Sequence, residues 1–250
     1  RVFARLIGIF FLIPLIFFIT YKKINTYLFH RLVVVFLFGI FQAFVGWWMV
    51  KSGLVDDPYV SPYRLTFHLT NAVIIYALLL WTTIEYYHLK NVRFITYNSR
   101  SLFIFISIIL VFITILSGGF MAGSHAGQSF NTYPLMNGKI IPNDIYLADL
   151  GILNIFENTV TINFNHRWIA TITFIYTFSF FTYLFFNKFI NLSNRIIFLV
   201  LIILSLQFLL GIMTLLSNVE IYYGSLHQTN SIALLSILLI AHFKSIIIGD

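Results

Sequence analysis

Histidine is the residue type in this sequence best suited to bind a metal ion, and three histidines share one kind of position. His68, His166 and His227 each lie at an end of a long apolar segment. A histidine beside hydrocarbon needs partners for its ring nitrogens, and neutral imidazole is a good ligand for iron. Two imidazoles at one depth of a four-helix bundle can clamp a haem between facing helices. These three histidines are therefore predicted to be haem-iron ligands.

Zinc is the competing metal for such histidines. A closed zinc site needs about four ligands, and the sequence contains no cysteine. No pair of acidic residues lies near these histidines in the sequence, so a planar macrocycle with two axial ligands fits the donors better. The other histidines near segment ends, His30, His88 and His242, are interpreted as interfacial residues hydrated by lipid headgroups.

Two arginines lie close to the predicted ligands. Arg64 precedes His68 by one helical turn, so both project from one face if the helix extends that far. Arg167 directly follows His166. Such arginines either extend their charge into interfacial water or pair with haem propionates through bidentate contacts. Both alternatives stay open, and Arg64 and Arg167 are candidates for cofactor binding.

The segments that carry these residues have the composition of a membrane protein. The chain of 250 residues is 60% hydrophobic and only 9% charged, whereas soluble domains are roughly 25% charged. Seven segments are long and apolar enough to be transmembrane helices. They cover residues 2–20, 32–50, 66–86, 101–118, 167–186, 196–216 and 227–246. The predicted fold class is an all-α polytopic membrane protein with about seven transmembrane helices.

The charges of the connections predict how these helices are oriented. The short connections 21–31, 87–100 and 187–195 are basic, and the alternate connections hold most of the acidic residues. By the positive-inside rule the basic connections face the cytoplasm. This orientation places the three histidines and the long connection 119–165 on the outer side. It also accounts for the net charge of +7, so the expected partner is a lipid membrane and no nucleic acid is expected.

An internal repeat relates the two parts of the chain. Short motifs recur in the same order at a nearly constant spacing. The matched pairs are Arg1 with Arg167, Gln42–Gly46 with Gln207–Gly211, and His68–Asn71 with His227–Asn230. The repeat predicts two related halves, residues 1–100 and residues 101–250. The second half has four helices, so the first half is expected to lack its first helix, and a histidine is expected directly before Arg1.

Several motifs along essentially the whole chain resemble the haem A synthase family. They include Gly46-Trp-Trp-Met-Val-Lys-Ser-Gly-Leu54, Phe130-Asn-Thr-Tyr-Pro-Leu-Met136, and Phe156-Glu-Asn158 followed by Asn165-His-Arg167. The resemblance implies two pseudo-symmetric four-helix bundles. It also implies a haem-dependent oxidoreductase that oxidises the C8 methyl group of haem O to the formyl group of haem A, for assembly of cytochrome oxidase.

The resemblance also implies a role for each histidine. His166 and His227 match the iron ligands of a haem b cofactor with bis-histidine ligation, and His68 matches a ligand of the substrate haem. The functional glutamate of the family is expected upstream of Arg1, so no catalytic residue is visible in the sequence. Its counterpart in the second half is Asn163, which cannot ionise and therefore agrees with a cofactor site.

Partners and location are implied by the same resemblance. The expected partners are haem O and haem A, haem O synthase, other cytochrome oxidase assembly proteins, and a second copy of the chain. The expected location is the inner membrane of a bacterial cell, with a mitochondrial inner membrane as the alternative. The alternative function is a di-haem b-type electron-transfer cytochrome, which would use the same histidines without modifying a haem. An acidic residue three positions before the expected upstream histidine would favour the synthase.

Overall fold

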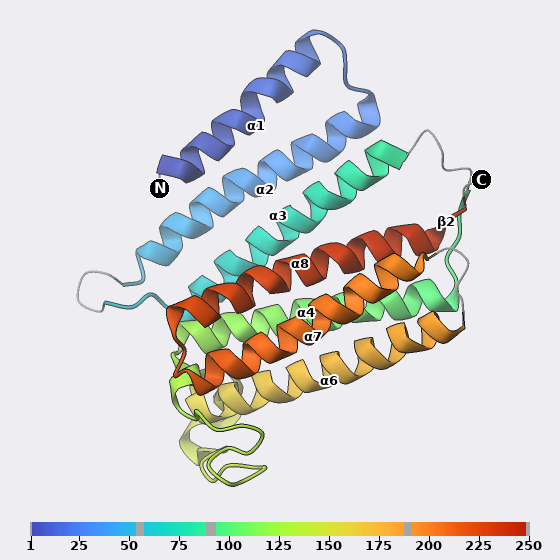
Figure 1. Ribbon diagram of the computed structural model, residues 1–250. Helices are drawn as coiled ribbons and strands as arrows, with labels where there is room; N and C mark the ends of the chain where they lie inside the picture. The colour runs from blue at the N-terminus through green and yellow to red at the C-terminus, as the bar shows by residue number, and fades with distance from the viewer. Residues whose placement is uncertain (1, 54–57, 89–93, 188–191, 249–250) are drawn as a thin grey trace.

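The structure is a computed structural model of the chain, and it describes residues 2–53, 58–88, 94–187 and 192–248 (Figure 1). Arg1 and parts of the predicted basic connections 87–100 and 187–195 lie outside these described residues. Seven long helices lie side by side in the described chain. They are α1 (Val2–Thr20), α2 (Thr26–Val50), α3 (Pro62–His88), α4 (Ser99–Gly123), α6 (Thr159–Phe186), α7 (Asn194–Leu216) and α8 (Ile221–Ile246).

The lengths and composition of these helices suit a membrane. Six of them are long and apolar enough to cross one, and α1 contains a shorter apolar stretch, Arg5–Thr20. Many large apolar side chains on the outer surfaces of the helices are exposed, as expected where lipid is the solvent. The predicted all-α polytopic membrane fold is confirmed.

Several helices start earlier than hydropathy predicts, because polar residues form their first turns. Helix α6 begins at Thr159 and not near residue 167. Helix α4 begins after a capping box, in which the Asn98 side chain accepts from the Ser101 N–H at 2.9 Å and the Ser101 hydroxyl accepts from the Asn98 N–H at 3.0 Å. A cap of this kind stabilises a helix by about 1 kcal/mol. As a result, His166 lies inside α6 and not at its start.

The predicted long connection 119–165 is shorter in the structure and partly helical. Helix α4 continues to Gly123, and the connection contains η1 (Ala126–Gln128), η2 (Ala148–Leu153) and α5 (Asn154–Glu157) before α6 begins. We call residues 124–158 the long loop. The end of the helix bundle where it lies is the loop end, and the opposite end is the linker end.

The helices form a four-helix bundle with a helical layer beside it. Helices α4, α6, α7 and α8 contact one another in the cyclic order α4–α6–α7–α8, which places α6 and α8 diagonally across the bundle. Helices α1, α2 and α3 lie in a row, and α3 joins this layer to α4 and α8 (Figure 1). The main buried apolar cluster is built by α3, α4, α6, α7 and α8. Because lipid is as apolar as the core, close packing of these side chains is what holds the helices together.

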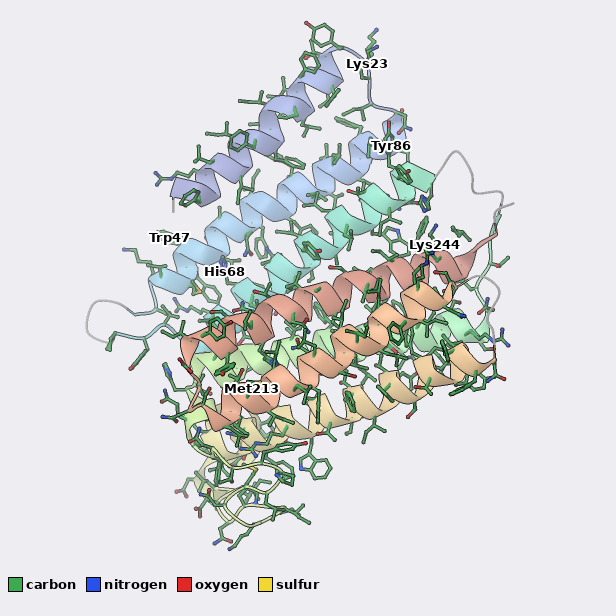
Figure 2. The ribbon with its side chains drawn as sticks, viewed as in Figure 1. Lys23, Trp47, His68, Tyr86, Met213 and Lys244 are labelled. Atoms are coloured by element: carbon green, nitrogen blue, oxygen red, sulfur yellow. The ribbon has the colours of Figure 1, made fainter. Side chains whose placement is uncertain are left out.

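Two short strands form the described β-structure. Strand β1 (Phe94–Ile95), in the connection from α3 to α4, pairs antiparallel with β2 (Ile247–Ile248), which follows α8. This pairing fastens the residues after α8 to the connection between the two halves. It lies at the linker end, where Figure 2 also shows Lys23, Tyr86 and Lys244, whereas Trp47 and His68 lie towards the loop end.

Candidate functional site

In the first half, His68 of α3 lies against a glycine of α2. A Cβ atom at Gly46 would come 2.9 Å from Cε1 of His68, closer than real side chains approach. One turn earlier on α2, Nε2 of Gln42 donates to the His68 carbonyl at 3.0 Å and lies 3.3 Å from Nε2 of the His68 ring. The Gln42 side-chain oxygen accepts from Nδ2 of Asn71 at 2.7 Å. We call this arrangement of glycine, glutamine and asparagine around a histidine the histidine clasp.

The second half repeats the clasp residue for residue between α7 and α8. A Cβ atom at Gly211 would come 2.9 Å from Cε1 of His227. Nε2 of Gln207 lies 3.2 Å from Nδ1 and 3.5 Å from Nε2 of the His227 ring. The Gln207 side-chain oxygen accepts from Nδ2 of Asn230 at 2.8 Å. The internal repeat is therefore also a repeat of side-chain contacts around a histidine.

His166 reaches the interior of the same bundle from α6. Its Nδ1 lies 2.8 Å from the hydroxyl oxygen of Ser117 on α4. A Cβ atom at Gly118 would come 3.4 Å from Cε1 of His166, so a glycine again leaves room for the ring. His166 and His227 are close enough to interact electrostatically. The structure thus brings these two predicted ligands together near the loop end, on diagonally opposed helices, and places His68 apart from them between α2 and α3.

Arg64 lies one turn before His68 and connects the ends of α2 and α3. Its Nη1 donates to the Trp48 carbonyl at 2.9 Å, and its guanidinium lies 4.5 Å from the centre of a Trp48 ring. A guanidinium has five N–H groups, so this arginine keeps donors for an anionic group at the loop end.

Arg167 fastens the long loop to α6. Its Nη2 and Nη1 donate to the carbonyls of Phe130 and Thr132, each at 2.7 Å, and its Nε donates to the Asn163 side chain at 2.6 Å. These bonds use three of its five N–H groups, so one hydrogen remains on each Nη nitrogen. The motif Phe130–Met136 that carries the family resemblance is therefore fastened to the residue that follows His166.

Asn163 is fully buried and completes the same network. Its Nδ2 donates to the Ala126 carbonyl at 2.7 Å, and its oxygen accepts from Arg167. The amide thus links the loop carbonyl of Ala126 to the Arg167 side chain. The resemblance implies a carboxylate at the equivalent position of the first half. In the second half, Asn163 stands at this position and helps to hold the long loop.

The interpretation of His242 as a hydrated interfacial residue is wrong. Its side chain is 8% exposed and packs between Trp81 of α3 and Phe105 of α4, with ring centres 5.9 and 5.6 Å away. It lies in the contact between the two halves at the linker end. His30 is exposed and His88 is partly exposed, as an interfacial position requires.

The donor set at the loop end consists of separate imidazoles. Within the described residues, no three His, Cys, Asp or Glu side chains come together in a group that could hold a metal ion. Each of the three histidines has a glycine beside its ring, which keeps the nearest helix surface free of side-chain atoms. Partly buried imidazoles held in place against a neighbouring helix suit the ligation of a haem iron.

Fold and site together define a membrane helix-bundle protein with two related imidazole sites. The chain belongs to the cytochrome oxidase assembly protein family, because the sequence model of that family matches residues 1–239. This result confirms the resemblance drawn from the motifs.

Relatives named "Heme A synthase" are similar along most of the chain. The protein of Wolbachia pipientis subsp. Culex pipiens (strain wPip) is 40% identical over 235 residues, which cover 94% of this chain and 69% of the relative. That of Nitrosospira multiformis is 40% identical over 243 residues, with 94% and 66% covered. That of Pelagibacter ubique is 34% identical over 245 residues, with 98% and 71% covered. The chain thus spans about two thirds of the length of these relatives.

Sequence reasoning singled out the three histidines as candidates but missed the residues that contact them in the structure. Gln42 and Gln207 served as markers of the repeat, and their recurrence at fixed distances from the histidines was a signal that they share a task. Ser117 carried no such signal, because it lies far from His166 in the sequence and meets it only when α4 packs against α6.

Proposed function

We propose that the chain is a haem A synthase, an oxidoreductase that oxidises the C8 methyl group of haem O to the formyl group of haem A. The observation that carries this proposal is the recurrence of the histidine clasp in both halves, in a chain whose relatives are named "Heme A synthase". A synthase of this kind needs one haem to be modified and one to exchange electrons, and two related histidine sites in one chain suit that need.

In this proposal His166 and His227 of the second half, residues 101–250, would hold the iron of a resident haem b. When bound, the haem supplies iron that can accept and return electrons. The protein holds the two imidazoles on diagonal helices. Arg167 holds the long loop over this end and keeps one hydrogen on each Nη nitrogen for a propionate.

The first half, residues 1–100, binds the substrate haem O. His68 would hold its iron, and Arg64 would offer N–H donors to a propionate at the same end of the helices. The glycine at position 46 lets the His68 ring pack against α2, which fixes the position of the ring. The two halves therefore differ in task while sharing one way of presenting a histidine.

We also propose that the chain lies in the inner membrane of a bacterial cell with its loop end outside. Basic side chains at the linker end support this orientation by the positive-inside rule. They are Lys22, Lys23, Arg100, Arg195 and Lys244. We propose three kinds of protein partner for this function. They are haem O synthase, other cytochrome oxidase assembly proteins and a second copy of the chain.

The proposal is tested by the products formed in cells that make haem O but no haem A. The chain is extended upstream with the corresponding segment of the Wolbachia relative, and extracted haems are separated by reverse-phase chromatography. Haem A should appear, and His68→Ala should abolish it while the haem b spectrum of the second half persists. A di-haem cytochrome would instead bind haem and undergo redox cycles without forming haem A in either protein, and that result would overturn the synthase proposal.

A further inference from the structure

The hydrogen bonds of Ser117 determine which nitrogen of His166 carries a proton. The Ser117 hydroxyl donates to the Thr114 carbonyl at 2.8 Å, and the same oxygen lies 2.8 Å from Nδ1 of His166. A hydroxyl has a single hydrogen to donate, and here Thr114 takes it. Both bonds can exist together only if Nδ1–H of His166 donates to the Ser117 oxygen. Nε2 of His166 then carries the lone pair that can bind iron.

His227 reaches the same state through a backbone carbonyl. Its Nδ1 lies 3.2 Å from the carbonyl oxygen of Gln207, which can only accept. The Gln207 amide nitrogen lies near both ring nitrogens, and its orientation is set by the bond from Asn230 to the amide oxygen. With the proton on Nδ1, the ring donates to the carbonyl, and iron can take the Nε2 lone pair in place of the 3.5 Å contact with the amide. With the proton on Nε2, the ring loses the bond to the carbonyl and has no lone pair on Nε2 for iron.

His68 lacks an acceptor of this kind. Its Nδ1 is buried and has no hydrogen-bond partner in the part of the chain that the structure describes. Its Nε2 faces the Gln42 amide nitrogen at 3.3 Å. Because the Gln42 oxygen is engaged by Asn71, that amide can only donate towards the ring. Two otherwise equivalent clasps therefore differ on the Nδ1 side of the histidine.

We propose that Ser117 is a positioning residue for His166, and that the acceptors behind His166 and His227 hold the haem of the second half against exchange. This inference rests on the proposed function, because it takes these histidines as haem ligands. The chemical class of the ligand is an iron porphyrin bound by two Nδ1–H imidazoles.

The physical reason lies in what an acceptor does to a ligating imidazole. A hydrogen bond from Nδ1–H orients the ring and increases the basicity of Nε2, and removing such a partner typically costs roughly 10- to 100-fold in metal affinity. Higher ligand basicity also stabilises ferric over ferrous iron and lowers the reduction potential. A resident haem benefits from both effects, whereas a substrate haem has to leave after each reaction.

The test uses the full 250-residue chain in a His68→Ala background, so that only the haem of the second half is measured. The haem b protein is purified in detergent, and two quantities are followed: the rate of haem transfer to excess apomyoglobin and the reduction midpoint potential. Ser117→Ala should transfer haem about tenfold faster and have a higher midpoint potential. Ser117→Thr keeps the hydroxyl and should restore both values.

The matched control is Ser124→Ala. Ser124 is the C-cap residue of the same helix, and its hydroxyl donates to the Phe120 carbonyl at 2.6 Å. Its loss therefore removes a comparable bond to a helix carbonyl without touching a predicted ligand. Equal transfer rates and potentials in Ser117→Ala and Ser124→Ala would overturn the role of Ser117 and leave the proposed function intact. If Ser117→Ala retains no haem, recovery in Ser117→Thr supports the proposal, and a threonine variant without haem contradicts it.

The failure of the proposed function looks different. In that case the parent protein takes up no haem b, or His166→Ala leaves its spectrum unchanged. Either result removes the haem ligand on which the inference depends, and the inference falls with it.

Discussion

The ring of His227 occupies the space that a side chain on Gly211 would need, since a Cβ atom there would come 2.9 Å from Cε1 of the imidazole. The same relationship holds between Gly46 and His68. The neighbouring helix therefore restricts the position of each ring in both halves. This restriction suits a metal ligand, because a ligand ring has to be in place before the metal arrives.

Gly211→Ala should displace the His227 ring and weaken haem binding to the second half by about tenfold or more. The measurement is the haem content per purified protein, determined as the pyridine haemochrome. Gly39→Ala is the control, because an added Cβ there meets no atom within 4 Å and alanine favours a helix over glycine by about 1 kcal/mol. Normal haem content in Gly211→Ala would show that the close approach is unimportant for binding.

His166→Ala and His227→Ala should each lose the low-spin bis-imidazole spectrum of haem b, because each removes one of two axial ligands. His30→Ala is the control, since His30 is exposed and its ring is bonded to the Thr26 carbonyl of its own helix at 2.7 Å. Optical spectra of the reduced proteins distinguish the outcomes. The ligand assignment is wrong if the control loses the spectrum and His227→Ala keeps it.

Cysteine labelling should reveal the orientation, and the sequence helps because it contains no cysteine. Tyr146→Cys and Tyr97→Cys are a matched pair, with parent side chains 65% and 78% exposed at the loop end and the linker end. In intact cells, a membrane-impermeant thiol reagent should label the cysteine at position 146 and leave that at position 97 unlabelled until the cells are opened. The reverse pattern would contradict the predicted orientation.

Arg167→Gln should loosen the long loop, because the bonds to the carbonyls of Phe130 and Thr132 are lost. One hydrogen bond from a charged group is worth about 1.5 kcal/mol or more, which corresponds to about a tenfold change in loop opening. Limited chymotrypsin digestion should therefore cleave near Tyr133 about tenfold faster. Lys139→Gln changes a charge in the same loop. The Lys139 side chain donates to the exposed Asn143, so this variant should be cleaved at the parent rate.

The arrangement of helices could be predicted from the sequence because hydropathy dominates in lipid. Every predicted apolar segment corresponds to a helix, and the charge pattern separates the two ends. The helix starts could not be predicted by the same signal, because polar caps and first turns such as Asn98 and Thr159 reduce hydropathy where the helix begins. The long connection therefore seemed longer and less structured than it is.

The histidines could be predicted for a similar reason, since their depth follows from the segments that carry them. The supporting contacts could not. Ser117 meets His166, and Asn163 meets Ala126, only through packing between residues far apart in the sequence. An asparagine that replaces a carboxylate could be read as a missing charge, but its hydrogen bonds to the long loop become visible only in three dimensions.

The pairing of β1 with β2 has a consequence for biosynthesis. Strand β2 follows α8, so the ribosome completes it only after all the described helices have been made. Until then, the Thr96 N–H lacks the Ile246 carbonyl to which it donates at 2.8 Å. Strand β1 likewise lacks its partner strand β2. A stop codon after Ser245 removes the Ile246 carbonyl together with β2. It should therefore speed amide hydrogen exchange at Thr96 while α1 to α7 stay intact, and unchanged exchange there would contradict this. Slow amide hydrogen exchange at Thr96, in the segment between the two halves, thus indicates that synthesis has reached the end of the last helix.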